Sequence, residues 1–280
     1  MDEIITLDYG SGGKKTARLI EKLIVPALSN PALDALGDGA IVEGAEKLAF
    51  STDSFVVDPI FFPGGDIGKL SVCGTVNDLA MCGAVPKYLS CSFIIEEGLP
   101  VEDLERIVES IRCTAERAGV QVVTGDTKVV ERGRGDKIYI NTAGIGFVKY
   151  PGLSPKNLRD GDTVIVSGMV GDHGTAIMLA RSGMMQGKIM SDCAPLNGLC
   201  EAILGTGAEV RVLRDPTRGG VATTLNEFIE GTALGIELRI KFRCGIRSTR
   251  HAICSALKRS TARMRASSLQ SLQRMTRSGC

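Results

Sequence analysis

The sequence predicts an α+β protein of two domains, with residues 1–150 forming the first domain and residues 151–238 beginning a second. The chain has 280 residues, which is enough for two domains of ordinary size. Up to residue 238, strand-like runs alternate with helix-like runs, and glycines stand at the junctions. The segment 151–155, Pro-Gly-Leu-Ser-Pro, has the composition of a linker and marks the expected boundary.

Four strands are expected where β-branched, apolar runs of strand length are bounded by glycine or aspartate. They cover residues 48–57, 120–130, 137–150 and 162–171. A helix is expected over residues 101–118, because its apolar residues recur at intervals of three and four, Pro100 precedes them and Gly119 follows. Two further helices are expected after glycine turns, at 68–82 and 217–230.

The composition excludes several classes of protein. Hydrophobic residues make up 44% of the chain and charged residues 23%, which provides a core and excludes wholesale disorder. No apolar run approaches the ~18 residues of a membrane-spanning helix and no signal peptide is recognisable, so a cytoplasmic protein is expected. The nine cysteines include no CxxC pair, and the two histidines do not complete a usual zinc site. Buried free thiols are the simpler interpretation.

Four turns that carry glycine, aspartate or both are the strongest candidates for chemistry. They are residues 10–13 (GSGG), 37–40 (GDGA), 52–54 (TDS) and 125–128 (GDTK). A single aspartate after a strand is ordinarily a turn former. Several of them, together with Asn77-Asp78 inside an apolar helix and with Lys128, favour Mg²⁺ and a polyphosphate. Glycine turns also let backbone N–H groups approach phosphate oxygens.

These motifs, followed by SGMVGDHGTAIM (167–178) and RDPTRGGVATTLNE (214–227), resemble the ATP-binding superfamily of aminoimidazole ribonucleotide synthetases. Within it, the chain resembles the HypE family of carbamoyl dehydratases over about residues 4–238. The resemblance implies a PurM-like fold whose N-terminal sheet domain forms a homodimer and whose C-terminal α/β sandwich domain is incomplete here. Selenophosphate synthetases share the superfamily, but they carry cysteine or selenocysteine in the N-terminal loop, where this chain has Leu7-Asp8-Tyr9.

The resemblance also implies a reaction, in which ATP drives dehydration of a carbamoyl group on a C-terminal cysteine to a thiocyanate. The product supplies cyanide to the iron of nickel–iron hydrogenase. The implied cofactors are ATP and Mg²⁺, and the implied partners are a second copy of the chain, the carbamoyltransferase HypF and the HypC–HypD complex. The matching positions are Lys128 and the carrier Cys280 for catalysis; Gly10, Ser11, Gly12, Gly13, Asp38, Asn77, Asp126, Thr127, Asp215, Arg218, Gly219 and Gly220 for ATP; and Asp38, Asp53, Asp78 and Asp126 for the metal.

Two other functions remain open from the sequence: a non-catalytic nucleotide-binding scaffold for hydrogenase maturation proteins, and another enzyme of the superfamily such as a selenophosphate synthetase. His173, in GDHGTA, is expected to orient its turn rather than to transfer protons.

The segment 239–280 does not continue the alternation of strand-like and helix-like runs. It holds 11 basic and no acidic residues, whereas residues 1–238 hold 22 basic and 32 acidic ones, and it shows no strand-like apolar run. Codons that encode residues 262–267, read one base earlier, allow Cys-Ala-Asn-Glu-Gly-Lys, which is the turn that the family has at this stage. We therefore interpret residues from about 239 onward as a frameshifted tail. The rival interpretation is a basic arm for nucleic acid, which the scarcity of aromatic residues disfavours.

Overall fold

A computed structural model describes residues 2–11, 13–36, 39–183, 189–217, 219–239 and 261–266. They form two compact units. The first comprises residues 1–151 and 173–208, and the second comprises 152–172 and the residues from 209 onward. The break after residue 151 falls in the expected linker, and residues 173–208 return to the first unit. The assignment of domains to 1–150, 151–238 and 239–280 stays a prediction.

The core of the first unit is a four-stranded sheet with the strand order β1-β6-β4-β5. Its strands are β1 (Leu48–Phe55), β4 (Ala84–Glu96), β5 (Gln121–Val130) and β6 (Ile138–Val148). β4 and β5 are parallel and are joined by helix α4 (Val101–Ala118), whereas β6 is antiparallel to both of its neighbours. The expected strands at 48–57, 120–130 and 137–150 and the expected helix at 101–118 are confirmed.

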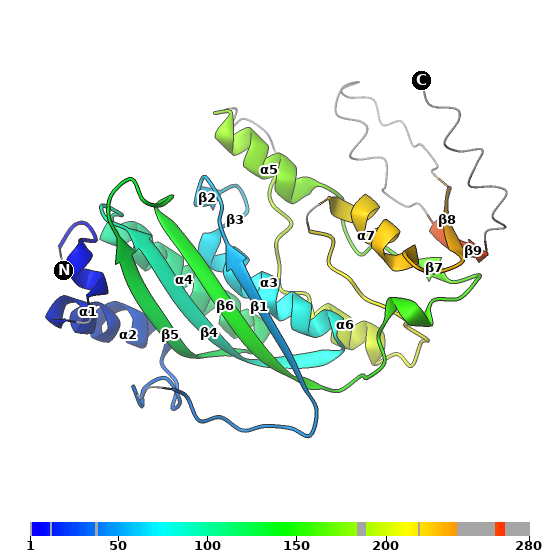
Figure 1. Cartoon of the computed structure of the whole chain (residues 1–280), viewed down its shortest axis with the longest axis horizontal. Coiled ribbons are helices and arrows are strands. Elements are labelled where there is room, and N and C mark those ends of the chain that lie inside the picture. The colour runs from blue at the N-terminus through cyan, green and yellow to red at the C-terminus, as the bar shows by residue number, and fades with distance from the viewer. Residues whose placement is uncertain are drawn as a thin grey trace. The chain divides into compact units, whose positions relative to one another are not determined.

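Helices α3 (Ile67–Met81) and α4 lie across the same face of this sheet (Figure 1). The sheet residues that face them are buried: along β6, for example, Ile138, Ile140 and Thr142 are covered while their neighbours are half-exposed. Thr142 meets Thr75 of α3 at 2.6 Å between hydroxyl oxygens, which pairs two polar groups inside an apolar layer. α3 is apolar on nearly all sides because it packs against both the sheet and α4.

Several elements of the first unit were not expected from the sequence. A helical run spans residues 14–28 and follows the 3-10 turn η1 (Leu7–Gly10). It consists of α1 (Lys14–Leu19), the π-helical turn η2 (Ile20–Ile24) and α2 (Val25–Leu28). Strand β4 was missed because Pro86 and a register irregularity at that point obscure its alternation. A short hairpin, β2 (Phe61–Phe62) and β3 (Gly65–Asp66), leads into α3, and Asp66 caps that helix by accepting from the N–H groups of Gly68 and Lys69.

Helices α5 (Asp172–Arg181) and α6 (Asn197–Leu204) follow the linker, and almost all of both belongs to the first unit. α6 begins where Asn197 donates to the backbone oxygen of Ala118, the last residue of α4, at 2.8 Å. Among the described residues, no helix is long and apolar enough to cross a membrane.

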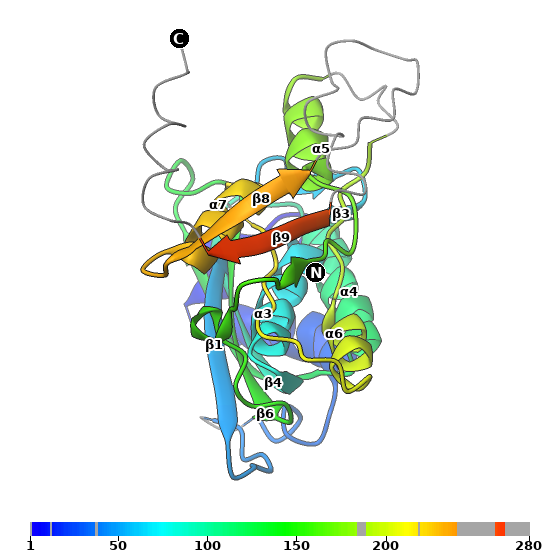
Figure 2. The ribbon, with the colours of Figure 1, turned by 90° about the vertical axis from the view of Figure 1, so that its right-hand side faces the viewer.

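The second unit contains η3 (Pro155–Asn157), helix α7 (Gly220–Ile229) and an antiparallel sheet of order β7-β9-β8, seen in Figure 2. The strands are β7 (Thr163–Val164), β8 (Leu234–Arg239) and β9 (Thr261–Ala266). The strand expected over 162–171 is only two residues long, because its pairing with β9 is limited to Thr163 and Val164. The expectation of no strand after residue 238 is wrong for β9, since backbone pairing to β8 does not require hydrophobic alternation.

Candidate functional site

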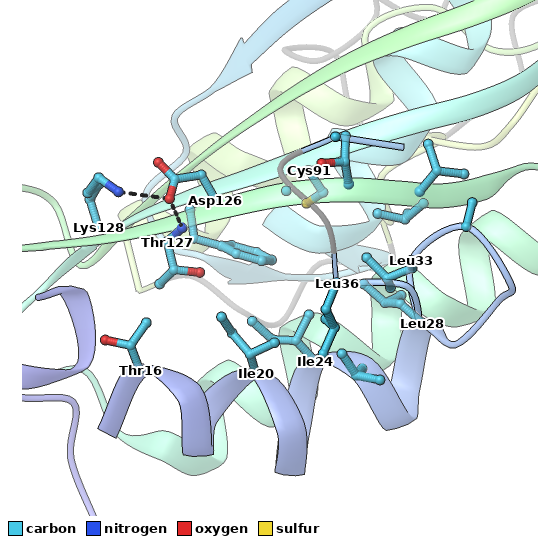
Figure 3. A pocket seen from close by; sticks show the side chains of 18 of the residues that line it. Thr16, Ile20, Ile24, Leu28, Leu33, Leu36, Cys91, Asp126, Thr127 and Lys128 are labelled. Atoms are coloured by element: carbon cyan, nitrogen blue, oxygen red, sulfur yellow. Dashed lines mark hydrogen bonds and ion pairs between the residues drawn. The ribbon is translucent and has the colours of Figure 1, made fainter. Parts of the chain in front are cut away.

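An apolar pocket of about 270 Å³ lies between the sheet and the helical run of residues 14–28 (Figure 3). One wall is made by Thr16, Ile20, Ile24 and Leu28, and the opposite wall by residues of β4 and β5 that include Cys91 and Phe93. The residues of the first wall are spaced by four, which is a helical periodicity. That spacing is the signal in the sequence by which this wall could have been found.

The polar rim of the pocket is the GDTK segment of β5. Asp126 and Lys128 are two residues apart on one strand, so their side chains point to the same face of the sheet. The Lys128 ammonium lies 2.8 Å from Asp126 Oδ1, and the Thr127 N–H donates to the same oxygen at 2.8 Å (Figure 3). The ion pair with Lys128 lowers the pKa of Asp126, and the Thr127 N–H adds to this effect.

This ion pair is open to solvent, since the side chains of Lys128 and Asp126 are 62% and 58% exposed. Exposed pairs contribute little to stability, because water competes for both partners. A phosphate or carbonyl oxygen can therefore replace Asp126 as the partner of Lys128 with little loss of folding energy. Lys128 thus offers a positive charge to a ligand at the rim of the pocket, and the stability of the fold depends little on its pairing with Asp126.

The glycine turn of residues 10–13 is brought next to this rim. Gly10 packs so closely on β5 that a Cβ there would overlap the backbone nitrogen of Val129. Gly10 is thus required for packing, and it places the following residues beside the GDTK segment. The Ser11 hydroxyl donates to the backbone oxygen of Asp8 at 3.0 Å, and Gly13 is the N-cap of α1. Gly12 lies outside the described residues.

The Asp53 side chain lies on the face of the sheet opposite to the Asp126 and Lys128 side chains, at the seam between β1 and α3, where α3 carries Asp78. The Ser51 hydroxyl donates to Asp78 Oδ2 at 2.7 Å. A Cβ built on Gly74, one helical turn before Asp78, would lie 3.4 Å from Asp53 Oδ2. The two carboxylates therefore lie near one another at the seam between β1 and α3. Ser51 was not singled out from the sequence, although it shares a strand face with Asp53 two residues later.

The predicted metal residues are not gathered into one cluster. The register places Asp53 in line with Thr142, Cys91 and Gly125, and Asp126 belongs to the next row, which faces the opposite side. Adjacent residues of a strand point to opposite faces, so Asp126 cannot join Asp53 within this sheet. Over the described ranges, no three His, Cys, Asp or Glu side chains are placed to share a metal ion. Asp38 lies outside those ranges, and the four-residue set stays a prediction.

Asn77 connects α3 to the segment that precedes α6. Its side chain is buried, donates to the backbone oxygen of Ala194 at 3.2 Å and accepts from the N–H of Leu196 at 2.8 Å. An amide that satisfies two backbone groups in this way is a structural clamp. Its predicted contact with ATP stays a prediction.

Replacing Asn77 by alanine should lower the free energy of unfolding by about 2–4 kcal/mol, because two backbone groups would lose their partners in a partly buried position. Urea unfolding followed by circular dichroism measures the change. Asn226→Ala is the matched control, since the Asn226 side chain is exposed and donates to the backbone oxygen of Ala222 within its own helix. A loss below ~0.5 kcal/mol for Asn77→Ala would contradict the clamp.

His173 is held at the start of α5 by several contacts. Its Nδ1 is 2.9 Å from the Ser191 hydroxyl, and its ring packs edge-on against Phe62 with 5.5 Å between centroids. Ser191 is itself fixed, because its N–H donates to the backbone oxygen of Pro63 at 2.8 Å. Burial lowers the pKa of His173, and the nearby Asp192 opposes that effect. These are the contacts of a positioning residue.

The lowered pKa of His173 makes stability depend on pH. Because the folded protein keeps this imidazole neutral, the unfolded chain binds the proton first as the pH falls below about 6.5. The stabilisation is present above that pH and is lost on acidification through the folded-state pKa. We expect His173→Gln to flatten the decline in the urea midpoint between pH 7 and pH 5. An unchanged decline would assign the acid sensitivity to other groups.

The remaining predicted residues are distributed elsewhere. Asp215, Gly219 and Gly220 lie in the second unit, just before or at the start of α7. Gly219 and Gly220 have φ angles of 74° and 61°, a left-handed conformation that glycine adopts without strain. Arg218 and Cys280 lie outside the described residues.

The chain matches two family descriptions in succession: AIR synthase related protein, N-terminal domain, over residues 36–148, and AIR synthase related protein, C-terminal domain, over residues 159–261. It is 47% identical over 257 residues to the carbamoyl dehydratase HypE of Azotobacter vinelandii, covering 90% of this chain and 75% of that protein.

Two solved structures extend these similarities. A crystal structure of the hydrogenase maturation protein HypE in complex with ATP has a TM-score of 0.81 and 50% identity, covering 83% of this chain and 70% of that one. A crystal structure of a HypE–HypF complex has a TM-score of 0.66 and 52% identity, covering 79% of this chain and 72% of that one.

Proposed function

The chain belongs to the AIR synthase related family and, within it, to the HypE carbamoyl dehydratases, and on that premise we propose that its site is built to dehydrate an S-carbamoyl group to a thiocyanate with ATP as co-substrate, an activity that is impaired in this chain. The thiocyanate would supply cyanide to the iron of nickel–iron hydrogenase. The observation that carries the proposal is the exposed Lys128 at the mouth of the pocket, held by Asp126 beside the Gly10 turn.

The chemistry requires an oxygen to leave carbon. An amide oxygen is a poor leaving group, so the carbamoyl oxygen first accepts the γ-phosphoryl group of ATP and ADP is released. The C–O bond then breaks, phosphate departs, and the nitrogen loses both protons as the C≡N bond forms. Lys128 is suited to this sequence, because its ammonium can donate hydrogen bonds to the oxygen on which negative charge develops. Asp126 orients that ammonium through the 2.8 Å contact.

Mg²⁺ would be held by Asp53 and Asp78 at the seam between β1 and α3. Two neighbouring carboxylates suit Mg²⁺, which usually takes one or two carboxylates together with phosphate oxygens and water. The hydrogen bond from Ser51 fixes one oxygen of Asp78, which orients this carboxylate before any ligand arrives. The ion would neutralise phosphate charge when bound.

We propose a homodimer formed through the open face of the sheet. α3 and α4 cover one face, whereas the side chains of Leu48, Phe50 and Ile94 are exposed, Phe50 to 70%. Uncovered large apolar side chains on a sheet favour association. Sedimentation of a strict monomer at micromolar concentration would contradict the dimer.

HypF as a partner is supported by the relative solved in complex with it. The transfer of a carbamoyl group by HypF, the HypC–HypD complex as a further partner and a cytoplasmic location stay predictions.

We also propose that residues from about 239 onward arise from a frameshift. In the shifted frame, the bases that would encode the glutamate of the family's Asn-Glu-Gly-Lys turn are read through Arg265, and a guanidinium cannot accept a proton. Cys280 would then be a terminal cysteine by coincidence and not a preserved carrier. Turnover by this chain should be absent or severely reduced. The DNA sequence around codon 239 tests the origin of the tail directly.

The decisive experiment supplies HypF, carbamoyl phosphate and ATP and follows Cys280 by mass spectrometry. We expect no dehydrated product. Loss of water from a carbamoylated Cys280 would show a working dehydratase and overturn the frameshift proposal, whereas carbamoylation alone would show a competent carrier without the proton chemistry. Calorimetry with Mg·ATP tests whether the chain binds nucleotide. No heat at millimolar nucleotide would contradict both a dehydratase and a nucleotide-binding scaffold.

A further inference from the structure

Two cysteine thiols that are distant in the sequence meet inside the first unit. Cys73 belongs to α3 and is 1% exposed, whereas Cys193, in the segment that leads to α6, is partly exposed. The two thiols are neighbours, because Asn77, one helical turn after Cys73, binds the backbone of Ala194, the residue after Cys193. Both are free thiols, so two reduced cysteines adjoin. Proximity of the two cysteines is the geometric precondition for a disulfide.

The backbone holds this contact independently of the sulfurs. Cys73 and Asn77 are four residues apart and therefore lie on the same side of α3. Asn77 clamps Ala194 and Leu196, directly after Cys193. On the other side of Cys193, its N–H donates to the Ser191 hydroxyl at 3.2 Å, and the N–H of Ser191 donates to the Pro63 backbone at 2.8 Å. The segment is thus anchored on both sides of Cys193, next to the turn of α3 that carries Cys73.

The surroundings give the two thiols different chemistry. The hydrogen bond from Cys73 stabilises the thiolate of Cys193 and lowers its pKa, and Lys69 adds to this effect while Asp192 and Asp66 oppose it. The same hydrogen bond and burial raise the pKa of Cys73. The more acidic thiol is also the more accessible one. Thiolate character and access together decide which cysteine attacks an oxidant first.

We propose that Cys73 and Cys193 are a reversible dithiol–disulfide site that is oxidised by a small-molecule disulfide such as glutathione disulfide. The Cys193 thiolate attacks one sulfur of glutathione disulfide, forming a mixed disulfide and releasing one glutathione thiolate. Cys73 loses its proton to that thiolate, or to solvent, and its sulfur attacks Cys193, which releases the second glutathione. Two cysteine thiols are oxidised by two electrons, and one glutathione disulfide is reduced to two thiols.

The disulfide would convert a hydrogen-bonded clamp into a covalent one. In the reduced protein, Asn77 ties residues 194–196 to α3 by two hydrogen bonds that can open and close. A bond between Cys73 and Cys193 would fix the same segment to the same helix one turn earlier. The segment leads directly into α6, so the disulfide would also tether the start of that helix.

The test incubates the reduced, full-length protein in glutathione buffers of increasing oxidised fraction, stops exchange with acid, blocks free thiols and maps peptides by mass spectrometry. We expect a linked Cys73–Cys193 peptide pair that dithiothreitol removes. Cys113→Ser is the matched control and should retain the link, since Cys113 is an exposed thiol that contacts Glu109 on α4. Glutathione on Cys193 without the link to Cys73 in the parent protein would overturn the proposal.

Two variants test the order of attack. Cys73→Ala should accumulate the mixed disulfide on Cys193, because the second thiol is missing, whereas Cys193→Ala should leave Cys73 unmodified until the protein is unfolded. Equal modification of Cys73 in Cys193→Ala would contradict the assignment. Because alanine at buried position 73 could prevent folding, hydrogen exchange of the parent protein supplies a second measurement. Oxidation should slow exchange at the amides of residues 193–196 by about tenfold or more, and unchanged rates would overturn the proposed tether.

Discussion

Replacing Asp78 by asparagine is expected to weaken the binding of Mg·ATP about 100-fold, equivalent to ~2.7 kcal/mol, with little effect on the stability of the nucleotide-free protein. The amide oxygen of asparagine can still accept the 2.7 Å hydrogen bond from Ser51, so the seam between β1 and α3 stays intact. The negative charge that would neutralise Mg²⁺ is removed. Asp126→Asn should also weaken nucleotide binding, because Lys128 would lose the carboxylate that orients it.

Isothermal calorimetry with and without Mg²⁺ measures these effects, and two controls isolate the charge. Ser51→Ala removes the hydrogen bond to Asp78 but leaves the carboxylate, so its loss of affinity should be much smaller. Asp103→Asn removes a carboxylate from the exposed face of α4, where it pairs with Arg106, and should leave binding unchanged. If Asp78→Asn and Asp126→Asn both bind Mg·ATP like the parent protein, the assignment of these carboxylates to the nucleotide site is wrong.

Replacing Gly68 by alanine is expected to destabilise the first unit by about 3 kcal/mol, the upper part of the usual range for overpacking a core. Gly68 is buried where α3 crosses α4, and a Cβ there would overlap the backbone oxygen of Ile107. A backbone carbonyl within a helix cannot move aside as a flexible side chain can. The same Cβ would lie 3.0 Å from Asp66 Oδ1, the oxygen that caps α3. The helix start and the helix crossing would be disturbed together.

The matched control is Gly198→Ala, in the exposed part of α6. No heavy atom lies within 4 Å of a Cβ built there. Because alanine is a better helix former than glycine, this variant should gain about 0.5–1 kcal/mol. Chemical unfolding of both variants, followed by circular dichroism, gives opposite signs if the helix crossing is as close as described. A neutral Gly68→Ala would show that α3 and α4 can separate without cost.

The sequence identified much of the first sheet because local patterns there agree with the tertiary environment. Helix α4 is apolar on one side only, since its other side faces water. Both ends of this helix were predicted to the residue. Helix α3 carries no such stripe, yet the glycine turn before it gave its start to within one residue. The helical run of residues 14–28 was missed because Pro26, a residue that ordinarily ends or kinks a helix, stands within it, although the residues on one side of the run recur every four positions.

For the candidate site, the sequence by itself determined which residue types carry chemistry and, through the order of the motifs, the family. It also placed Lys128 and Asp126 two residues apart on one strand. That relation is local, because side chains two residues apart on a strand share a face. Only the tertiary structure decided which distant groups meet. Strand register set Asp126 and Asp53 on opposite faces of the sheet, the packing of α3 brought Ser51 to Asp78, and the return of residues 189–196 placed Cys193 on Cys73. These contacts depend on how strands and helices are aligned across the core, and no spacing along the chain encodes that alignment.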